Sequence, residues 1–349
     1  MLDTAKLPDR LLDASPMQWL PASDLNLLPH LVNAHAHHDT NPWGWDGGRV
    51  LAELWARGVG RVGMVAFDSA SYVDGVAAIA QAARVPIPCY VEALTLTPCD
   101  GEEWNDLPGR MYLQAGPFTS SADAAPLTNA LVRLARQRAT YQIDRWNESL
   151  PLGFRYQPDL DALSVRGLTE ANLCRDLVDS VNRLSPDPSA VWRAIPGLTA
   201  DPSDPNFARA FRTATMVSDA AVARVPRTSE FYLPAQRFVE LSGGRAHYMY
   251  VGKHTGVEAN REALLDRMRE IGLHSVCVIP QRNMLSPADT EDLNRLLGLL
   301  EGRRVGVLLG TELNAHGQWW SVDLRADPFA KHGAWLEACW EAAAAASIA

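Results

Sequence analysis

Short apolar runs rich in β-branched residues recur along the chain, and most of them end in polar residues or glycine. We expect each run to form a strand buried on both sides, because continuous apolar runs of this length are typical of parallel sheets. The predicted strands cover residues 31–34, 60–67, 88–94, 110–115, 246–251, 275–279 and 305–310.

Helical patterns separate most of these runs. Alternation of strand and helix is typical of a parallel sheet, and seven or eight such strands predict an α/β fold with a parallel (β/α) barrel. This barrel is expected to be either TIM-like or a distorted variant of that form. The helical patterns cover residues 49–57, 72–84, 258–271 and 287–300.

The alternation breaks between about residues 120 and 244, where helical patterns are separated by proline-rich turns such as SPDPSAVW. We interpret this segment as a helical insertion or cap within a single barrel domain that spans residues 1–349. A run at residues 190–195 leaves an alternative open, because it would supply an eighth strand.

Composition narrows the class of protein. The 349 residues carry a formal charge of -9 that is spread along the chain, which argues against nucleic acid as a partner. The five cysteines lack CxxC spacing, so neither a disulfide framework nor a structural zinc site is expected. No apolar run approaches the roughly 18 residues of a membrane span. We therefore expect a cytoplasmic protein with a small-molecule substrate; the sequence leaves open whether it forms a homo-oligomer.

The first apolar run leads into NAHAHHDT, which holds three of the nine histidines. Residues two apart in a strand face the same side, so we expect His35 and His37 to point together into the mouth of the barrel. Active sites of such barrels lie at the carboxyl ends of the strands, and two imidazoles on one face form half of a metal site. The alternative is a histidine-rich loop without a chemical role.

Carboxylates near the next strand ends are further candidates. Asp68 follows the second run, and Glu92 lies inside the third, in CYVEALTL. A carboxylate in a buried strand is costly unless it is paired, protonated or bound to a cation. We expect Glu92 to bind the metal, with an ion pair to an arginine such as Arg110 as the alternative.

Loops after the later runs complete the predicted site. His254 follows the fifth run and is expected to be a metal ligand or a general acid-base, because imidazole titrates near neutrality. Glu312 follows the last run and is expected to bind metal or to accept a proton from bound water. The residues expected to bind substrate are Lys253, Arg282, Asn314, Gln318 and Trp43. The alternatives are an exposed basic turn for Lys253, turn formation for Asn314 and Gln318, and core packing for Trp43.

With these residues, the sequence resembles the PHP (polymerase and histidinol phosphatase) family of metal-dependent hydrolases. The resemblance rests on the HxH of NAHAHH, the glutamate of VEALTL and the final GTELN. The chain departs from that family where Gln114 replaces a fourth-strand histidine, where Phe67 and Asp68 replace Asp-His, and where Glu312 and Asn314 replace aspartate and histidine. The amidohydrolase superfamily also begins with HxH and ends on a last-strand carboxylate, and it is the alternative.

The resemblance implies hydrolysis by a water that a divalent metal activates. Zinc is expected, with manganese or iron as alternatives, and one or two ions are expected. Glu312, His254 and Asp68 are the predicted catalytic residues. The predicted substrate is a small anionic phosphoester or C–N compound, because Arg282 and Lys253 suit an anionic group. The alternatives are a metal-dependent lyase or isomerase acting on a sugar acid, and a barrel that binds a ligand without turnover.

Overall fold

The structure of the protein is a computed structural model that describes residues 25–164, 167–218 and 221–348. The chain forms two compact units. The first consists of residues 25–129 and 234–348, and the second of residues 130–233.

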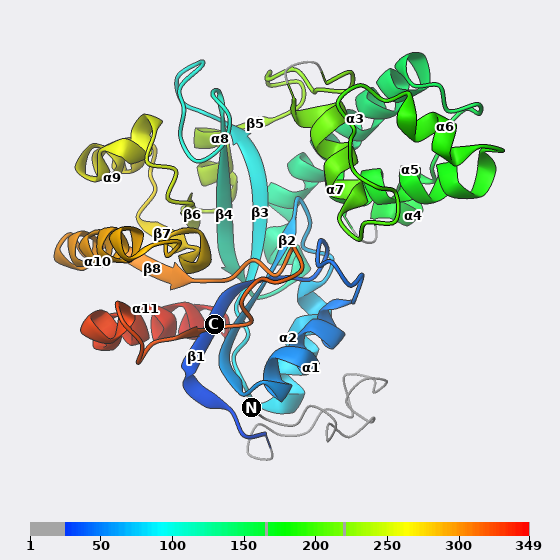
Figure 1. The fold of residues 1–349 in the computed structure, drawn as a ribbon. Coiled ribbons are helices and arrows are strands. Elements are labelled where there is room, and N and C mark those ends of the chain that lie inside the picture. Colours follow the sequence, from blue (N-terminus) through cyan, green and yellow to red (C-terminus); the bar gives the residue numbers. More distant parts are fainter. Residues whose placement is uncertain (1–24, 165–166, 219–220, 349) are drawn as a thin grey trace. The chain divides into compact units, whose positions relative to one another are not determined.

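A curved, mixed sheet forms the core of the first unit (Figure 1). Its strands lie in the order β8–β7–β6–β4–β3–β2–β1–β9. A parallel bridge between Ala36 and Glu312 joins β1 to the segment after β8, so the sheet is a nearly closed barrel. The strands are β1 (Leu28–His37), β2 (Val59–Phe67), β3 (Cys89–Leu96), β4 (Arg110–Phe118), β5 (Leu233–Pro234), β6 (Ala246–Tyr250), β7 (Ser275–Val278), β8 (Gly306–Leu309) and β9 (Val322–Asp323).

Helices follow most of these strands. The first of them begins where the Asp46 side chain accepts a hydrogen bond from the backbone N of Arg49, and it then buries Val50, Leu51 and Leu54. The helices of the first unit are α1 (Gly47–Ala56), α2 (Val73–Ala83), α8 (Ala235–Leu241), α9 (Arg261–Glu270), α10 (Pro287–Gly302) and α11 (Gly333–Ala346), with short 3-10 turns η6 (Gly256–Ala259), η7 (Pro280–Arg282) and η8 (Phe329–His332).

The α/β barrel expected from the sequence is confirmed, and each of the seven predicted runs contains a strand. The purely parallel sheet is wrong, because β4 runs antiparallel to both β3 and β6. The reason is local: residues 97–109 contain no helix, and without a crossover helix the chain returns beside β3 in the opposite direction.

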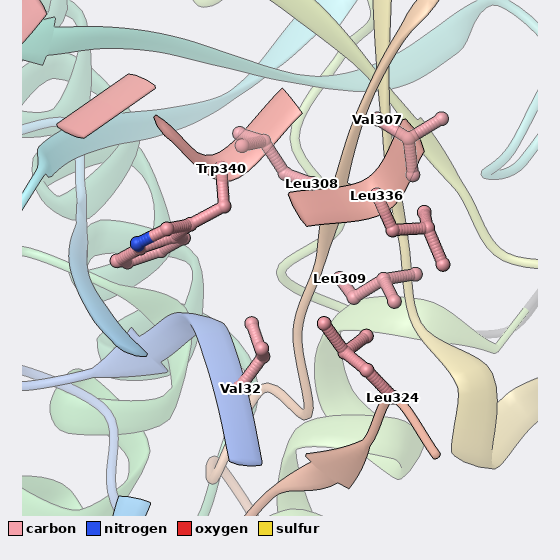
Figure 2. A pocket seen from close by; sticks show the side chains of 7 residues that line it. All are labelled: Val32, Val307, Leu308, Leu309, Leu324, Leu336 and Trp340. Atoms are coloured by element: carbon pink, nitrogen blue, oxygen red, sulfur yellow. The ribbon is translucent and has the colours of Figure 1, made fainter. Parts of the chain in front are cut away.

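β1 and β8 approach each other without a continuous ladder of backbone hydrogen bonds, and apolar side chains fill the space beside them. Figure 2 shows Val32 of β1 facing side chains of β8 and α11 across a small pocket. Val32 lies on the opposite face of β1 from His35 and His37, as the two-residue period requires. This pocket therefore belongs to the packing of α11 on the outside of the barrel. Its lining consists of Val32, Val307, Leu308, Leu309, Leu324, Leu336 and Trp340.

In the second unit the described elements are helices, apart from Leu233 of β5, and the unit has its own apolar core, in which Trp146, Phe211 and Leu177 are buried. The possible strand at residues 190–195 is wrong: Asp187 caps the backbone N of Ala190, and a helix begins there. In neither unit is a described helix long and apolar enough to cross a bilayer. The helices are α3 (Ser121–Ser149), which begins in the first unit, α4 (Leu160–Ser164), α5 (Glu170–Leu184), α6 (Pro188–Arg193), α7 (Phe207–Arg212) and the π-turn η5 (Thr213–Val217).

Candidate metal centre

Three side chains from β1 and β3 meet inside the barrel. The Nε2 atoms of His35 and His37 lie 3.2 Å apart. Oε2 of Glu92 lies 3.0 Å from Nε2 of His35 and 3.3 Å from Nε2 of His37. All three residues are buried, and we call them the triad. The predicted ligands His35, His37 and Glu92 are therefore brought together at one point.

The spacing of these three atoms fits a bound divalent cation. Ligands held about 2.0 Å from a tetrahedral zinc ion lie about 3.3 Å from one another, close to the edges of the triad. Oε2 of Glu92 is buried and makes no well-formed hydrogen bond, although both imidazoles lie beside it. A buried carboxylate oxygen without such a bond is costly, and a cation would satisfy it.

The opposite nitrogen of each imidazole lies beside an oxygen atom. Nδ1 of His35 lies 2.6 Å from Oε1 of Gln114, and Nδ1 of His37 lies 3.2 Å from Oδ1 of Asp39. These oxygens accept, so each Nδ1 carries the hydrogen in a neutral imidazole, and each Nε2 presents its lone pair to the triad. Oδ2 of Asp39 in turn accepts from the backbone N of Phe67 at 2.9 Å.

Strand register explains why these side chains converge. Glu92 and Gln114 are direct partners on antiparallel β3 and β4, so both side chains face the same side of the sheet. His35 and His37 share the inner face of β1 by the two-residue period. The alternative pairing of Glu92 with Arg110 does not occur, because Arg110 bonds Asp106 at 3.0 Å.

The carboxylate of Glu92 and the two imidazoles each shift the pKa of the other. Burial by itself lowers the pKa of His37, but Asp39 and Glu92 outweigh it and raise that pKa to about 10. Burial by itself raises the pKa of Glu92, but the two imidazoles lower it to about 2. The carboxylate is therefore ionised at neutral pH, which is the form that binds a cation.

Glu312 lies beside the triad and is held by two partners. Its backbone O accepts from the backbone N of His37 at 3.0 Å. Its Oε2 accepts from Arg282 at 2.8 Å and from Gln318 at 3.1 Å. The carboxylate of Glu312 thus binds a guanidinium and an amide and is not one of the triad ligands.

Two other predicted ligands of substrate or metal have partners outside the triad. The Lys253 ammonium donates to the backbone O of Asp106 at 2.7 Å and forms an ion pair with Glu103. Nδ1 of His254 lies 3.5 Å from Asp292 of α10, and the His254 side chain is 48% exposed. The structure does not bring either residue into the triad.

The remaining predicted residues belong to turns and loops. Asp68 follows β2, and its backbone N donates to the backbone O of Glu92. Gln318 accepts from the backbone N of Asn314 at 2.6 Å, so these two residues close a turn. Trp43 stacks on Trp45 and on Trp320, with ring centroids 4.7 and 5.0 Å away.

Sequence reasoning assigned no role to the residues behind the imidazoles. Asp39 follows His37 by two positions, and Gln114 is a polar residue inside an apolar strand; both signals were present in the sequence. Cys277 of β7 is buried 3.7 Å from Nδ1 of His35, and nothing in its sequence context distinguishes it from a core residue.

No protein-family model and no curated protein matches the sequence. Two solved structures are similar to this chain. One is a proposed metal-dependent phosphoesterase from Bifidobacterium adolescentis, with 16% identity, 82% of this chain and 88% of that chain covered, and a TM-score of 0.49. The other is an amidohydrolase from Chromobacterium violaceum with bound sulfate and no metal, with 14% identity, the same coverage and a TM-score of 0.48.

Proposed function

We propose that the protein is a metal-dependent hydrolase whose triad holds one divalent cation. The observation that carries this proposal is the orientation of both imidazoles: Gln114 and Asp39 occupy the Nδ1 atoms, so both Nε2 atoms face Glu92. Metal-binding histidines in proteins characteristically have such an oxygen partner behind them, which fixes the tautomer. A structural cluster of histidines has no need of three lone pairs directed at one point.

Zinc is the cation that this donor set favours. Two imidazole nitrogens and one carboxylate oxygen are typical of catalytic zinc sites, which keep a further position for water or substrate. The described residues contain one such group of three, so we propose a single ion. The five cysteines are free thiols, as in a protein of the cytoplasm, where we place it.

The cation would supply Lewis acidity, which makes a water molecule nucleophilic near neutral pH. His35, His37 and Glu92 would hold it, and Asp39 and Gln114 would orient the two imidazoles. Substitution of Asp68 or His254 by alanine tests their predicted roles in catalysis.

Arg282 is the residue that we assign to the anionic part of the substrate. Its side chain is 48% exposed, whereas the Glu312 carboxylate that it contacts is buried. Burial lowers the pKa of Arg282, but Glu312, Tyr112 and Glu92 raise it, so the guanidinium is charged and close to the triad. We favour Arg282 over Lys253 because the partner of Arg282 is Glu312, whose backbone bonds His37 of the triad, whereas the partners of Lys253 are Glu103 and Asp106. The substrate would be a phosphoester or a C–N compound that carries this anionic group.

The test is the double variant His35→Ala with His37→Ala, and His316→Ala is the control because its side chain is exposed. We expect the double variant to lose stoichiometric zinc, measured by mass spectrometry of the purified protein, and to lose hydrolysis of p-nitrophenyl phosphate or of an amide panel. The control should keep both. Full zinc stoichiometry in the double variant would place the metal elsewhere and refute the proposal.

A further inference from the structure

The loop after β8, residues 311–320, is fixed at both of its sides. On one side, the Gln281 amide accepts from the backbone N of Trp319 at 2.8 Å and donates to the backbone O of Gly317 at 3.4 Å. On the other side, the Trp320 ring lies between Trp43 and the guanidinium of Arg57, which is 3.8 Å from the ring centroid. The loop is therefore held in one position before any ligand binds.

Trp319 is the large apolar residue of this fixed loop that is exposed to water. Its exposure is 38%, and among the described tryptophans it alone is more than a third exposed. Its neighbour Trp320 is only partly exposed and stacked. An aromatic ring that a fixed loop exposes can stack on a planar ligand with little loss of conformational freedom.

Trp319 lies next to the groups that we assign to the substrate. Gln281, which bonds the Trp319 backbone, directly precedes Arg282. Arg282 in turn contacts Glu312, whose backbone bonds the backbone of His37. The backbone of Trp319 is thus fixed to the residue before Arg282, and Arg282 is linked through Glu312 to the triad.

We propose that Trp319 and Arg282 form a two-point subsite for substrates that combine an anionic group with a planar aromatic group. Arg282 binds the anion, and Trp319 stacks on the ring. The inference rests on the proposed function and names the substrate class of the same site. Trp319 is thus the specificity residue, and Trp43 and Trp320 hold the loop that presents it.

The experiment compares two anions that the enzyme cannot hydrolyse, phenylphosphonate and methylphosphonate, in calorimetric titrations of the zinc-loaded protein. Wild type should bind the phenyl compound about tenfold more tightly, as one good stacking contact provides. Trp319→Ala should reduce this ratio to below about twofold, and Trp319→Phe should restore most of it. Trp335→Ala, a substitution of a partly exposed tryptophan on α11, should leave the ratio unchanged.

Arg282→Met should weaken both phosphonates while the ratio between them persists, because the ring contact remains. An equal affinity of wild type for the two anions, or an unchanged ratio in Trp319→Ala, would overturn the subsite. Zinc content measured on the same samples separates the two proposals. Stoichiometric zinc at the triad without a phenyl preference refutes the subsite alone, whereas a phenyl preference without zinc at the triad refutes the metal centre alone.

Discussion

Gly310 lies directly against His35: a Cβ at residue 310 would overlap the His35 Cβ and would come within 2.9 and 3.0 Å of its backbone N and Cα. The end of β8 can approach β1 this closely only without a side chain. We expect Gly310→Ala to displace His35 and to weaken zinc binding. Forcing extra volume into such a packed site costs about 1–3 kcal/mol of unfolding free energy, measurable by urea titration.

Gly75→Ala is the matched control for this substitution. No atom lies within 4 Å of a Cβ at residue 75, and the residue is inside α2. Alanine is the better helix former there, so the free energy of unfolding should rise by about 0.5–1 kcal/mol with zinc binding unchanged. Similar effects of the two substitutions would show that Gly310 does not limit the position of His35.

Asp39→Ala should weaken zinc binding by about 10- to 100-fold, because the partner that orients His37 is lost. A competition titration with a chromogenic chelator measures this affinity. Asp46→Ala serves as the contrast: it removes the cap of α1 and should cost about 1 kcal/mol of stability while zinc affinity stays the same. Unaltered zinc affinity in Asp39→Ala would show that Asp39 does not support the zinc site.

The role of Gln114 can be tested by changing the side-chain atom that contacts His35. Gln114→Leu removes the oxygen that accepts from Nδ1 of His35, and zinc affinity should fall by about 10- to 100-fold. Gln114→Glu keeps an acceptor oxygen and should retain zinc. Long-range proton–nitrogen NMR of the zinc protein should find the hydrogen of His35 on Nδ1; a hydrogen on Nε2 would contradict the proposed tautomer.

Metal-free protein should become less stable as the pH rises from about 6.5 towards about 10. The pKa of His37 is raised to about 10 in the fold from an ordinary value of 6.5, so the protonated imidazole stabilises the fold below that interval and is lost through it. Zinc requires the neutral imidazole, so its affinity should rise over the same interval. Urea titrations and zinc titrations across this range measure the two trends.

Glu92→Gln provides the check, because without the carboxylate the pKa of both imidazoles should fall and the dependence of stability on pH should flatten. An equally steep dependence in Glu92→Gln would show that other groups cause it.

Trp43→Ala should remove the central ring of the stack formed by Trp43, Trp45 and Trp320. The contacts of Trp43 with the other two indoles are lost, which costs about 1–3 kcal/mol of unfolding free energy. The near-ultraviolet circular dichroism of the coupled indoles should fall strongly, whereas Trp335→Ala should alter it little. A spectrum of Trp43→Ala that matches wild type would contradict the stacked arrangement.

The sequence predicts the triad well because its signals are local. The two-residue period of β1 places His35 and His37 on one face, and Glu92 is conspicuous as a carboxylate within an apolar strand. Both inferences need only the direction in which a strand presents its side chains.

The loops are harder to predict, because their partners lie far away in the sequence. Lys253 and His254 follow a strand end, but the left-handed backbone of Gly252 and His254 turns the chain there, and their side chains meet Glu103 and Asp292. No local pattern identifies those partners. The reversal of β4 did have a signal, since the segment before it lacks a helical pattern.

The three proposed ligands come from residues 35–92, while the proposed recognition residues, Arg282 and Trp319, come from the last quarter of the chain. The residues proposed to bind the ion and those proposed to select the substrate thus lie in separate segments of the sequence, which come together only in the folded barrel. Exchange of the late loops, with Gly310 and Glu312 kept because they contact His35 and His37, is a route to new specificities that keeps the three proposed ligands.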